Sequence, residues 1–333
     1  MRAEIIRPGE RTTGVPRLAW VRILLLALGL FAGAVGGLEG YWRSQGLRPS
    51  VPDDTNLWRF WRTRVYEPRG KVVVFLGTSR IRSDIDLQTL ATRAPTFRSV
   101  QLGVNGDVSP LGTLRSLALD PRFRGVVVCE LASPFLPRSR WNDQREFFDR
   151  PAGSVAFDRL VYAYLRDQSV VLLPRVTLSS SVQHFLAGEP WPRLARSRAV
   201  FDRSVQYDDA VTRVPLDDRL QLAEQKPVEP QLALEGLKDL REIVQRIQSR
   251  HGAVVFVRLP ASAPSVATTE SGFTGTLDWK RIAEVTGAVC ISLDTGDSLG
   301  PFHCRDGVHL DPAQAKRLTE RLVAELHGNR LLE

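Results

Sequence analysis

Short, continuously apolar runs recur along most of the chain, and each one ends in a glycine, a proline or a polar turn. Runs of this length, rich in valine and isoleucine, are typical of strands that are buried on both faces of a parallel sheet. Such runs begin at Lys71, Val126, Ala253 and Ala288, and the segment from Ser99 indicates a further strand that leads into a glycine-rich turn. The pattern therefore predicts about five core strands.

Amphipathic stretches separate these runs, with apolar residues recurring at helical spacing. One helix is predicted to start at Ser109-Pro110, a second carries the apolar stripe from Leu234 to Ile247, and a third runs from Asp311-Pro312 to about Leu326. In the third, the aspartate suits the capping position and the proline the first helical position. Strands that alternate with helices predict an α/β fold, here a flavodoxin-like three-layer α/β/α sandwich around a parallel sheet.

The segment between the third and fourth core strands, residues 136–230, is too long for a simple crossover. Its apolar positions indicate amphipathic helices, the first of them near Phe157 to Leu165. We therefore expect a helical insertion. Two interpretations fit it equally: a lid or substrate wall above the carboxyl edge of the sheet, or a structural excursion remote from that edge.

The amino-terminal region is organised around an uninterrupted apolar run from Ile23 to Leu38, which Leu18 to Val21 extend across Arg22. About 20 such residues span a bilayer, and the arginines that precede the run keep that side cytoplasmic. We expect a cytoplasmic tail at 1–17, a transmembrane anchor at 18–40, a juxtamembrane linker at 41–70 and a folded domain at 71–330. A cleaved signal peptide is the alternative, because Ala32-Gly33-Ala34 resembles a cleavage site.

The linker contains an aromatic stretch, Leu57-Trp58-Arg59-Phe60-Trp61. It fits either a juxtamembrane docking helix or ordinary packing onto the domain. With this topology the main domain lies outside the cell membrane, in the periplasm or the extracellular space.

The net charge of +8 does not indicate a nucleic-acid partner. Lysine supplies only five of the 45 basic residues, and the arginines are scattered singly without the interleaved aromatic residues of a nucleic-acid surface. The five histidines have no metal-ligand spacing. We therefore expect no nucleic acid, no metal and no cofactor.

A carboxylate and a histidine stand three residues apart in Asp306-Gly307-Val308-His309, just before the last predicted helix. Such a loop can orient an imidazole as a general base, since the carboxylate fixes the tautomer and stabilises the imidazolium. The candidate nucleophile is Ser79, which follows the first core strand and Gly77. Ligands of open α/β sheets bind at the carboxyl ends of the strands, so we expect Ser79, Asp306 and His309 to converge there.

Three segments in this order resemble the sequence blocks of the SGNH, or GDSL-like, hydrolase superfamily. Gly77 to Arg80 matches the nucleophile block, Gln101 to Asp107 the second block, and Asp306 to His309 the terminal block. The resemblance spans roughly residues 71–326, with the long insertion in the middle.

The resemblance implies an ester-hydrolase site with defined roles. Ser79 would be the nucleophile, His309 the base and Asp306 the residue that orients it. The backbone N–H groups of Ser79 and Gly103 would hold the oxyanion.

This sequence departs from the family in its third block, where a Gly-x-Asn-Asp motif supplies an asparagine as a further oxyanion donor. The strand that begins at Val126 is followed instead by Ala132-Ser133-Pro134-Phe135, without an asparagine. Losing one such donor typically lowers the rate by about 100- to 1000-fold. Asn105, in the second block, is the available substitute.

Other residues at the same sheet edge carry charge. Arg80 and Arg258 could bind an anionic substrate group or a sugar, and Glu130 could add a carboxylate to the site. Internal salt bridges explain these side chains equally well. Among the cysteines, we expect a disulfide between Cys290 and Cys304, with Cys129 free and buried in its strand.

Three functional hypotheses follow. The first is a membrane-anchored serine esterase or O-acyltransferase acting on a cell-envelope glycan or lipid ester, alongside envelope polysaccharide machinery. The second is a non-catalytic SGNH-like scaffold or glycan-binding module of the envelope. The third is another strand-loop hydrolase such as a phosphoesterase, which the lack of carboxylate-rich metal motifs disfavours.

Overall fold

The structure of the protein is a computed structural model that describes residues 17–66, 71–149, 155–174, 176–188, 197–207, 230–261, 279–294, 300–304 and 307–332. The chain divides into two compact units. Residues 1–48 and 169–192 form the first, and residues 49–168 and 193–333 form the second.

The second unit is built on a five-stranded parallel sheet in the order β2-β1-β3-β6-β7. The strands are β1 (Lys71–Leu76), β2 (Phe97–Gln101), β3 (Val126–Glu130), β6 (Ala253–Arg258) and β7 (Val289–Ser292). Each begins within two residues of the position that the apolar pattern predicts. The central strands are almost wholly buried, which explains why they contain unbroken apolar runs rather than alternating ones.

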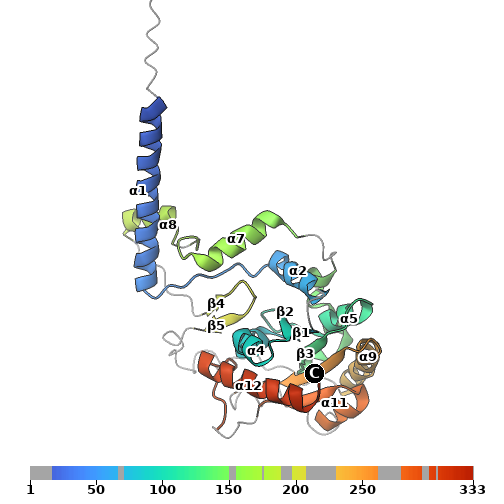
Figure 1. Ribbon diagram of the computed structural model, residues 1–333. Helices are drawn as coiled ribbons and strands as arrows, with labels where there is room; N and C mark the ends of the chain where they lie inside the picture. The colour runs from blue at the N-terminus through green and yellow to red at the C-terminus, as the bar shows by residue number, and fades with distance from the viewer. Residues whose placement is uncertain are drawn as a thin grey trace, which may run out of the picture. The chain divides into compact units, whose positions relative to one another are not determined.

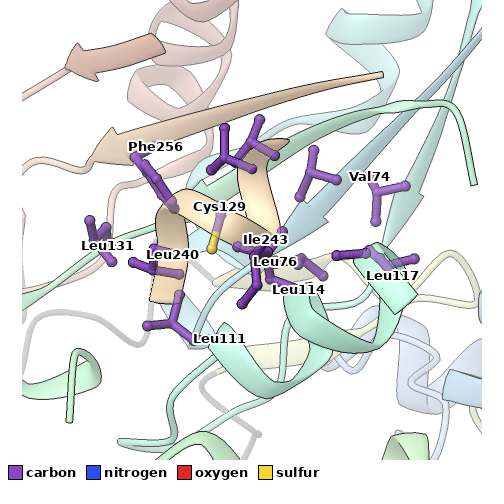
Figure 2. Packing of buried hydrophobic residues seen from close by; sticks show 14 of the residues in the cluster. Val74, Leu76, Leu111, Leu114, Leu117, Cys129, Leu131, Leu240, Ile243 and Phe256 are labelled. Carbon is purple, nitrogen blue, oxygen red and sulfur yellow. The ribbon is translucent and has the colours of Figure 1, made fainter. Parts of the chain in front are cut away.

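Helices cover both faces of this sheet (Figure 1). One face carries α5 (Leu111–Leu119), α9 (Pro230–Gln248) and α11 (Trp279–Thr286), and the other carries α3 (Ser79–Asp84), α4 (Leu87–Arg93) and α12 (Pro312–Gly328). Figure 2 shows the first face, where leucines of α5 and α9 pack on alternate strand residues such as Val74 and Leu76. The three-layer α/β/α sandwich predicted from the sequence is confirmed.

The last helix begins as its sequence predicts. Asp311 caps α12 by accepting a hydrogen bond from the Gln314 backbone N–H at 2.9 Å, and Pro312 occupies the first turn. Buried leucines of α12 pack against the sheet. This packing holds the start of the helix, and the loop before it, at the carboxyl edge of the strands.

The domain begins before Lys71, because the aromatic part of the expected linker is packed into the core. In α2 (Thr55–Thr63) the Trp58 ring is 1% exposed, and its Nε1 donates a hydrogen bond to the Leu102 carbonyl at 3.0 Å. Ordinary packing onto the domain is therefore the outcome for this stretch. A 3₁₀ turn (Arg64–Tyr66) follows it.

The insertion contains helices, as expected, but it also contains a hairpin that the pattern does not predict. After the 3₁₀ turn η2 (Ser133–Phe135), its described elements are η3 (Arg138–Asn142), α6 (Arg145–Phe148), α7 (Phe157–Gln168), α8 (Leu178–Ala187), β4 (Ser197–Ala199) and β5 (Val205–Tyr207). The strands β4 and β5 pair in antiparallel fashion. Each has only three residues, too few for apolar alternation to be visible in the sequence.

The first unit contains the apolar amino-terminal helix, α1 (Arg17–Ser44), which extends past the expected end of the anchor at residue 40. Its Ala19–Ser44 stretch is long and apolar enough to cross a membrane. The Glu39 carboxylate accepts hydrogen bonds from the Val170 and Val171 N–H groups, both at 3.0 Å, and Trp42 packs on Val170. These contacts attach the segment that leads to α8 to the end of α1.

The expected disulfide is absent: Cys129, Cys290 and Cys304 are all free. Cys304 belongs to the cluster on the α12 face of the sheet, whereas Cys290 packs against the cluster on the α5 face. The two thiols therefore lie on opposite faces, because neighbouring residues of a strand point to opposite sides and Ile291, not Cys290, faces α12. Cys129 is buried in β3, as predicted.

Candidate active site

The turn after β1 presents Ser79 at the carboxyl edge of the sheet. Glu130, at the end of the neighbouring strand β3, accepts hydrogen bonds from the Thr78 N–H at 2.8 Å and from the Thr78 hydroxyl at 2.9 Å. Gly77 makes this approach possible, since a Cβ on it would lie 2.6 Å from Glu130 Oε2. Ser79 then opens α3 with its side chain half-buried.

Arg80 and Glu130 brace this turn internally. Arg80 Nη1 lies 3.5 Å from Glu130 Oε1, and its Nη2 donates to the carbonyls of Leu259 and Pro260 at 2.5 and 2.7 Å. These bonds connect the nucleophile turn to the end of β6. Of the two interpretations offered above, the structure therefore shows the internal salt bridge. This contact accounts for the positions of both side chains without a bound substrate.

Arg258 has a similar position one strand further along. Its Nε donates to the Ser292 hydroxyl at 3.0 Å, and its Nη2 forms an ion pair with Asp294 at 2.6 Å. These contacts tie β6 to the end of β7. Arg258 therefore serves the sheet edge rather than the vicinity of Ser79.

His309 and Ser79 lie together although 230 residues separate them: His309 Nε2 is 2.9 Å from Ser79 Oγ. Both side chains are half-buried. This is the geometry in which an imidazole removes a hydroxyl proton when the Nε2 nitrogen is unprotonated. Asp306, the expected third member, lies outside the described residues.

Asp84 is a carboxylate near His309 that the sequence pattern did not single out. It ends α3, and its Oδ1 accepts a hydrogen bond from the Leu310 N–H at 3.0 Å. The short helix α3 thus carries the candidate nucleophile at one end and holds the chain beside the candidate base at the other. Complete burial raises the pKa of Asp84 to about 6, although the nearby charges of His309 and Arg80 act in the opposite direction.

The backbone N–H of Gly103 does not point into the site. It donates to the side-chain oxygen of Gln101 at 3.0 Å, and the Gln101 amide in turn donates to the Ile81 carbonyl at 3.0 Å. In this structure the Gly103 N–H therefore already has an acceptor, and its expected role as an oxyanion donor stays a prediction. The physical reason for this bond is the fully buried Gln101, which must satisfy its own polar atoms and uses the Gly103 N–H to do so.

Two other oxyanion donors, Ser79 and Asn105, are expected from the sequence. The Ser79 N–H lies in the first turn of α3, where N–H groups have no partner within the helix, and no acceptor for it occurs in the described part of the chain. Asn105 is exposed, and its Oδ1 accepts a hydrogen bond from Arg82 Nη1 at 2.7 Å. That bond fixes the amide so that its NH₂ group is free to donate elsewhere.

The β4–β5 hairpin of the insertion is attached to the loop after β2. Arg203, fully buried, donates to the carbonyls of Gln101 and Gly103, each at 2.9 Å, and pairs with Asp53 at 2.7 Å. Arg82 donates to the Arg203 carbonyl at 2.9 Å and shares the Asp53 carboxylate. Burial and the charge of Arg203 lower the pKa of Arg82 to about 10.

The hairpin brings one more functional group to the pair of Ser79 and His309. The Tyr207 ring stacks on the imidazole with centroids 4.6 Å apart and planes at 25°, and its hydroxyl lies 3.3 Å from His309 Nε2. This part of the insertion is therefore a wall of the site and not a remote excursion. No periodic signal in the sequence marks Tyr207.

Comparisons with known proteins give similarity to solved structures only. No protein-family model matches the chain, and no curated protein matches it. The structure is similar to the crystal structure of TesA, with 13% identity over 78% of this chain and 99% of that one, and a TM-score of 0.36. It is also similar to the protein YXIM from Bacillus subtilis, with 12% identity over 79% of this chain and 58% of that one, and a TM-score of 0.33. Similarity at this level does not identify a reaction.

Proposed function

We propose that this protein is a membrane-anchored serine esterase or O-acyltransferase of the SGNH type, which acts on ester groups of a cell-envelope glycan or lipid. The observation that carries the proposal is the contact of 2.9 Å between Ser79 Oγ and His309 Nε2 at the carboxyl edge of the sheet. Both groups are half-buried, and they lie within the hydrogen-bond reach that a nucleophile and its base require.

In the proposed reaction, Ser79 Oγ attacks the ester carbonyl while His309 Nε2 takes the serine proton. His309 then protonates the leaving alcohol, and an acyl-Ser79 intermediate remains. Water or another hydroxyl attacks this intermediate with the same base, which releases the acid or transfers the acyl group. Asp306 has the orienting role in this scheme that the sequence resemblance implies.

The oxyanion of the tetrahedral intermediate is assigned to two donors, the Ser79 N–H and the side-chain amide of Asn105. Arg82 supports the second donor by holding the Asn105 carbonyl oxygen. With the Gly103 N–H engaged by Gln101, this set differs from the one that the family resemblance implies. We expect modest turnover with simple esters, because a site with fewer donors stabilises the transition state less.

The membrane part of the proposal rests on α1, whose Ala19–Ser44 stretch has the length and apolar composition of a membrane span. Arginines concentrate before it, which favours a cytoplasmic amino terminus and an exported domain. A reporter enzyme fused after Glu333 should be active outside the inner membrane. Activity of a cytoplasm-dependent reporter at that position would contradict the topology.

The test of the activity uses the full chain in detergent with p-nitrophenyl acetate. The protein should release p-nitrophenol slowly but catalytically, and Ser79→Ala should remove that release. Ser249→Ala is the matched control, since Ser249 is exposed and its hydroxyl only contacts its own helix end. Equal turnover by the protein and by Ser79→Ala would refute the enzyme.

A second candidate function is a non-catalytic envelope module that binds a glycan. Two observations favour it over an active hydrolase: the Gly103 N–H is engaged by Gln101, and the Tyr207 hydroxyl lies against the base. In that case no ester or serine-directed reagent should react at Ser79, although the domain folds normally.

A further inference from the structure

Within the described part of the chain, two hydroxyl oxygens lie near Nε2 of the candidate base. His309 Nε2 lies 2.9 Å from the Ser79 hydroxyl and 3.3 Å from the Tyr207 hydroxyl. A serine–histidine acyl transfer needs two such positions, because the imidazole exchanges protons first with the nucleophile and then with the leaving or incoming hydroxyl. Ser79 fills the first position, and Tyr207 lies in the second.

We propose that the Tyr207 hydroxyl occupies the subsite for the acyl acceptor, and that this subsite takes an aliphatic alcohol such as a sugar hydroxyl. Tyr207 then controls the fate of the acyl group by keeping water from the base until an acceptor displaces it. This inference rests on the proposed function and specifies its acceptor class.

The backbone of the hairpin and the Tyr207 side chain are held beside His309 by different contacts. Its turn is fixed to the loop after β2 by the buried Arg203, Arg82 and Asp53, so the hairpin itself stays in place. The Tyr207 side chain, by contrast, is only half-buried, and it meets the base through ring stacking and a hydrogen bond of 3.3 Å. Rotation of this side chain out of the subsite would leave the hairpin backbone attached.

The transfer step is balanced without a further reactant. The acceptor hydroxyl gives its proton to His309 Nε2, and its oxygen forms a bond to the acyl carbon. The bond from that carbon to Ser79 Oγ breaks, and Oγ receives the proton back from Nε2. The Tyr207 hydroxyl takes no part in bond making, and it returns to the subsite once the ester product leaves.

The alternative role for Tyr207, an oxyanion donor, predicts the opposite response to removal of the hydroxyl. An oxyanion donor stabilises the transition state, so its loss slows acylation. A group that fills the acceptor subsite competes with the acceptor, so its loss helps. Tyr207→Phe separates the two, because it keeps the stacked ring and removes only the oxygen.

The experiment compares the full chain with Tyr207→Phe in detergent, using p-nitrophenyl acetate as acyl donor and methanol as the alcohol. We expect the variant to hydrolyse the donor about 2- to 10-fold faster in the absence of methanol, the factor that one net hydrogen bond represents. The KM for methanol should fall by a similar factor, since no hydroxyl must be displaced. Tyr162→Phe removes the hydroxyl of an exposed tyrosine on α7 and is the matched control.

A rate that falls in Tyr207→Phe overturns the proposal in favour of an oxyanion donor, and an unchanged rate and KM overturn it in favour of a structural role. Folding of the variant is checked by its melting temperature, and Tyr207→Leu provides a second hydroxyl-free variant should the first be unstable. The proposed function fails separately, through absence of Ser79-dependent turnover in the unmodified protein, and the acceptor subsite fails with it.

Discussion

The nucleophile turn and the loop after β2 lie side by side at the same sheet edge, yet they are held in different ways. In the nucleophile turn, the buried Glu130 and Arg80 fix the backbone from below and leave the Ser79 hydroxyl and N–H free to act. In the loop after β2, the Gln101 side-chain oxygen accepts a hydrogen bond from the Gly103 N–H. The internal hydrogen bonds of the first region thus leave the Ser79 hydroxyl exposed to the site. In the second region they engage the Gly103 N–H.

This difference shows that a segment can match a sequence block while its backbone N–H group is bonded to another acceptor. The two regions resemble the corresponding SGNH sequence blocks about equally well. They differ in whether a buried polar side chain forms hydrogen bonds with the same backbone groups that catalysis would use. The Glu130 carboxylate accepts hydrogen bonds from Thr78 and not from Ser79, whereas the Gln101 side-chain oxygen accepts from the Gly103 N–H.

Loss of the candidate base, which contacts the first of the two regions, should have the largest effect. His309→Ala removes the base, and we expect ester turnover to fall by about 1000-fold or more, as large as the loss in Ser79→Ala because the two act as one unit. Steady-state p-nitrophenyl acetate kinetics measure it. His327→Ala, on the exposed last turn of α12, should leave turnover unchanged. A fall of only a few-fold in His309→Ala would show that the imidazole is not the base.

Glu130→Ala tests whether the nucleophile turn depends on its buried support. Removing this carboxylate leaves Arg80 and the Thr78 N–H without their partner, and breaking such a buried pair typically costs about 3 to 5 kcal/mol of unfolding free energy. Denaturant unfolding of the full chain in detergent measures the loss. Asp239→Asn breaks the exposed pair with Arg138 and should cost less than about 1 kcal/mol. Equal effects of the two changes would mean that Glu130 is not a structural support.

The raised pKa of Asp84 predicts that the free energy of unfolding changes with pH in one defined direction. Its pKa of about 6 lies above the value of about 3.9 in an unfolded chain, so the folded state binds the extra proton between these values. Unfolding free energy therefore falls as pH rises from about 4 to about 6, by up to about 3 kcal/mol for this group. Asp84→Asn should gain stability relative to the unmodified protein across that window and keep the gain above it.

The control for this effect has the opposite sign. Hydrogen bonds from Arg122 hold the pKa of Asp120 well below its usual range, so Asp120 adds stability that disappears as the pH falls. Asp120→Asn should therefore lose stability at neutral pH and approach the unmodified protein in acid. Parallel pH profiles for the two variants would contradict the assignment of Asp84.

Asn105→Ala tests the loop after β2 and should have the smallest effect of the four. If its amide replaces the missing donor, turnover falls by about 100-fold, the lower end for loss of an oxyanion donor. Asn142→Ala, at an exposed position of the insertion, is the control. Unchanged turnover in Asn105→Ala would leave the Ser79 N–H as the principal donor and widen the difference between the two regions.

The sequence predicted the elements whose signal is local. The central strands β1 and β3 were found because their buried runs are almost unbroken in apolar residues, and the start of α12 because Asp311 and Pro312 suit the start of a helix. The contact of Ser79 with His309 was predictable from the order of the motifs, since strands of a parallel sheet end at one edge.

The rest depends on individual side-chain contacts, most of them between residues that are distant in sequence. Nothing local indicates that Gln101 binds the Gly103 N–H, that Asp84 binds Leu310, or that a hairpin places Tyr207 on His309. The disulfide prediction failed for the same reason, because proximity in the last loop said nothing about which face of the sheet Cys290 occupies.

The central claim is that Ser79 is a nucleophile activated by His309, and covalent labelling tests it most directly. The full chain in detergent is treated with a fluorophosphonate, and the modified residue is identified by peptide mass spectrometry. We predict a single adduct on Ser79, which is absent in Ser79→Ala and forms at least 100-fold more slowly in His309→Ala. An adduct on another serine, or no adduct on the folded protein, would contradict the account.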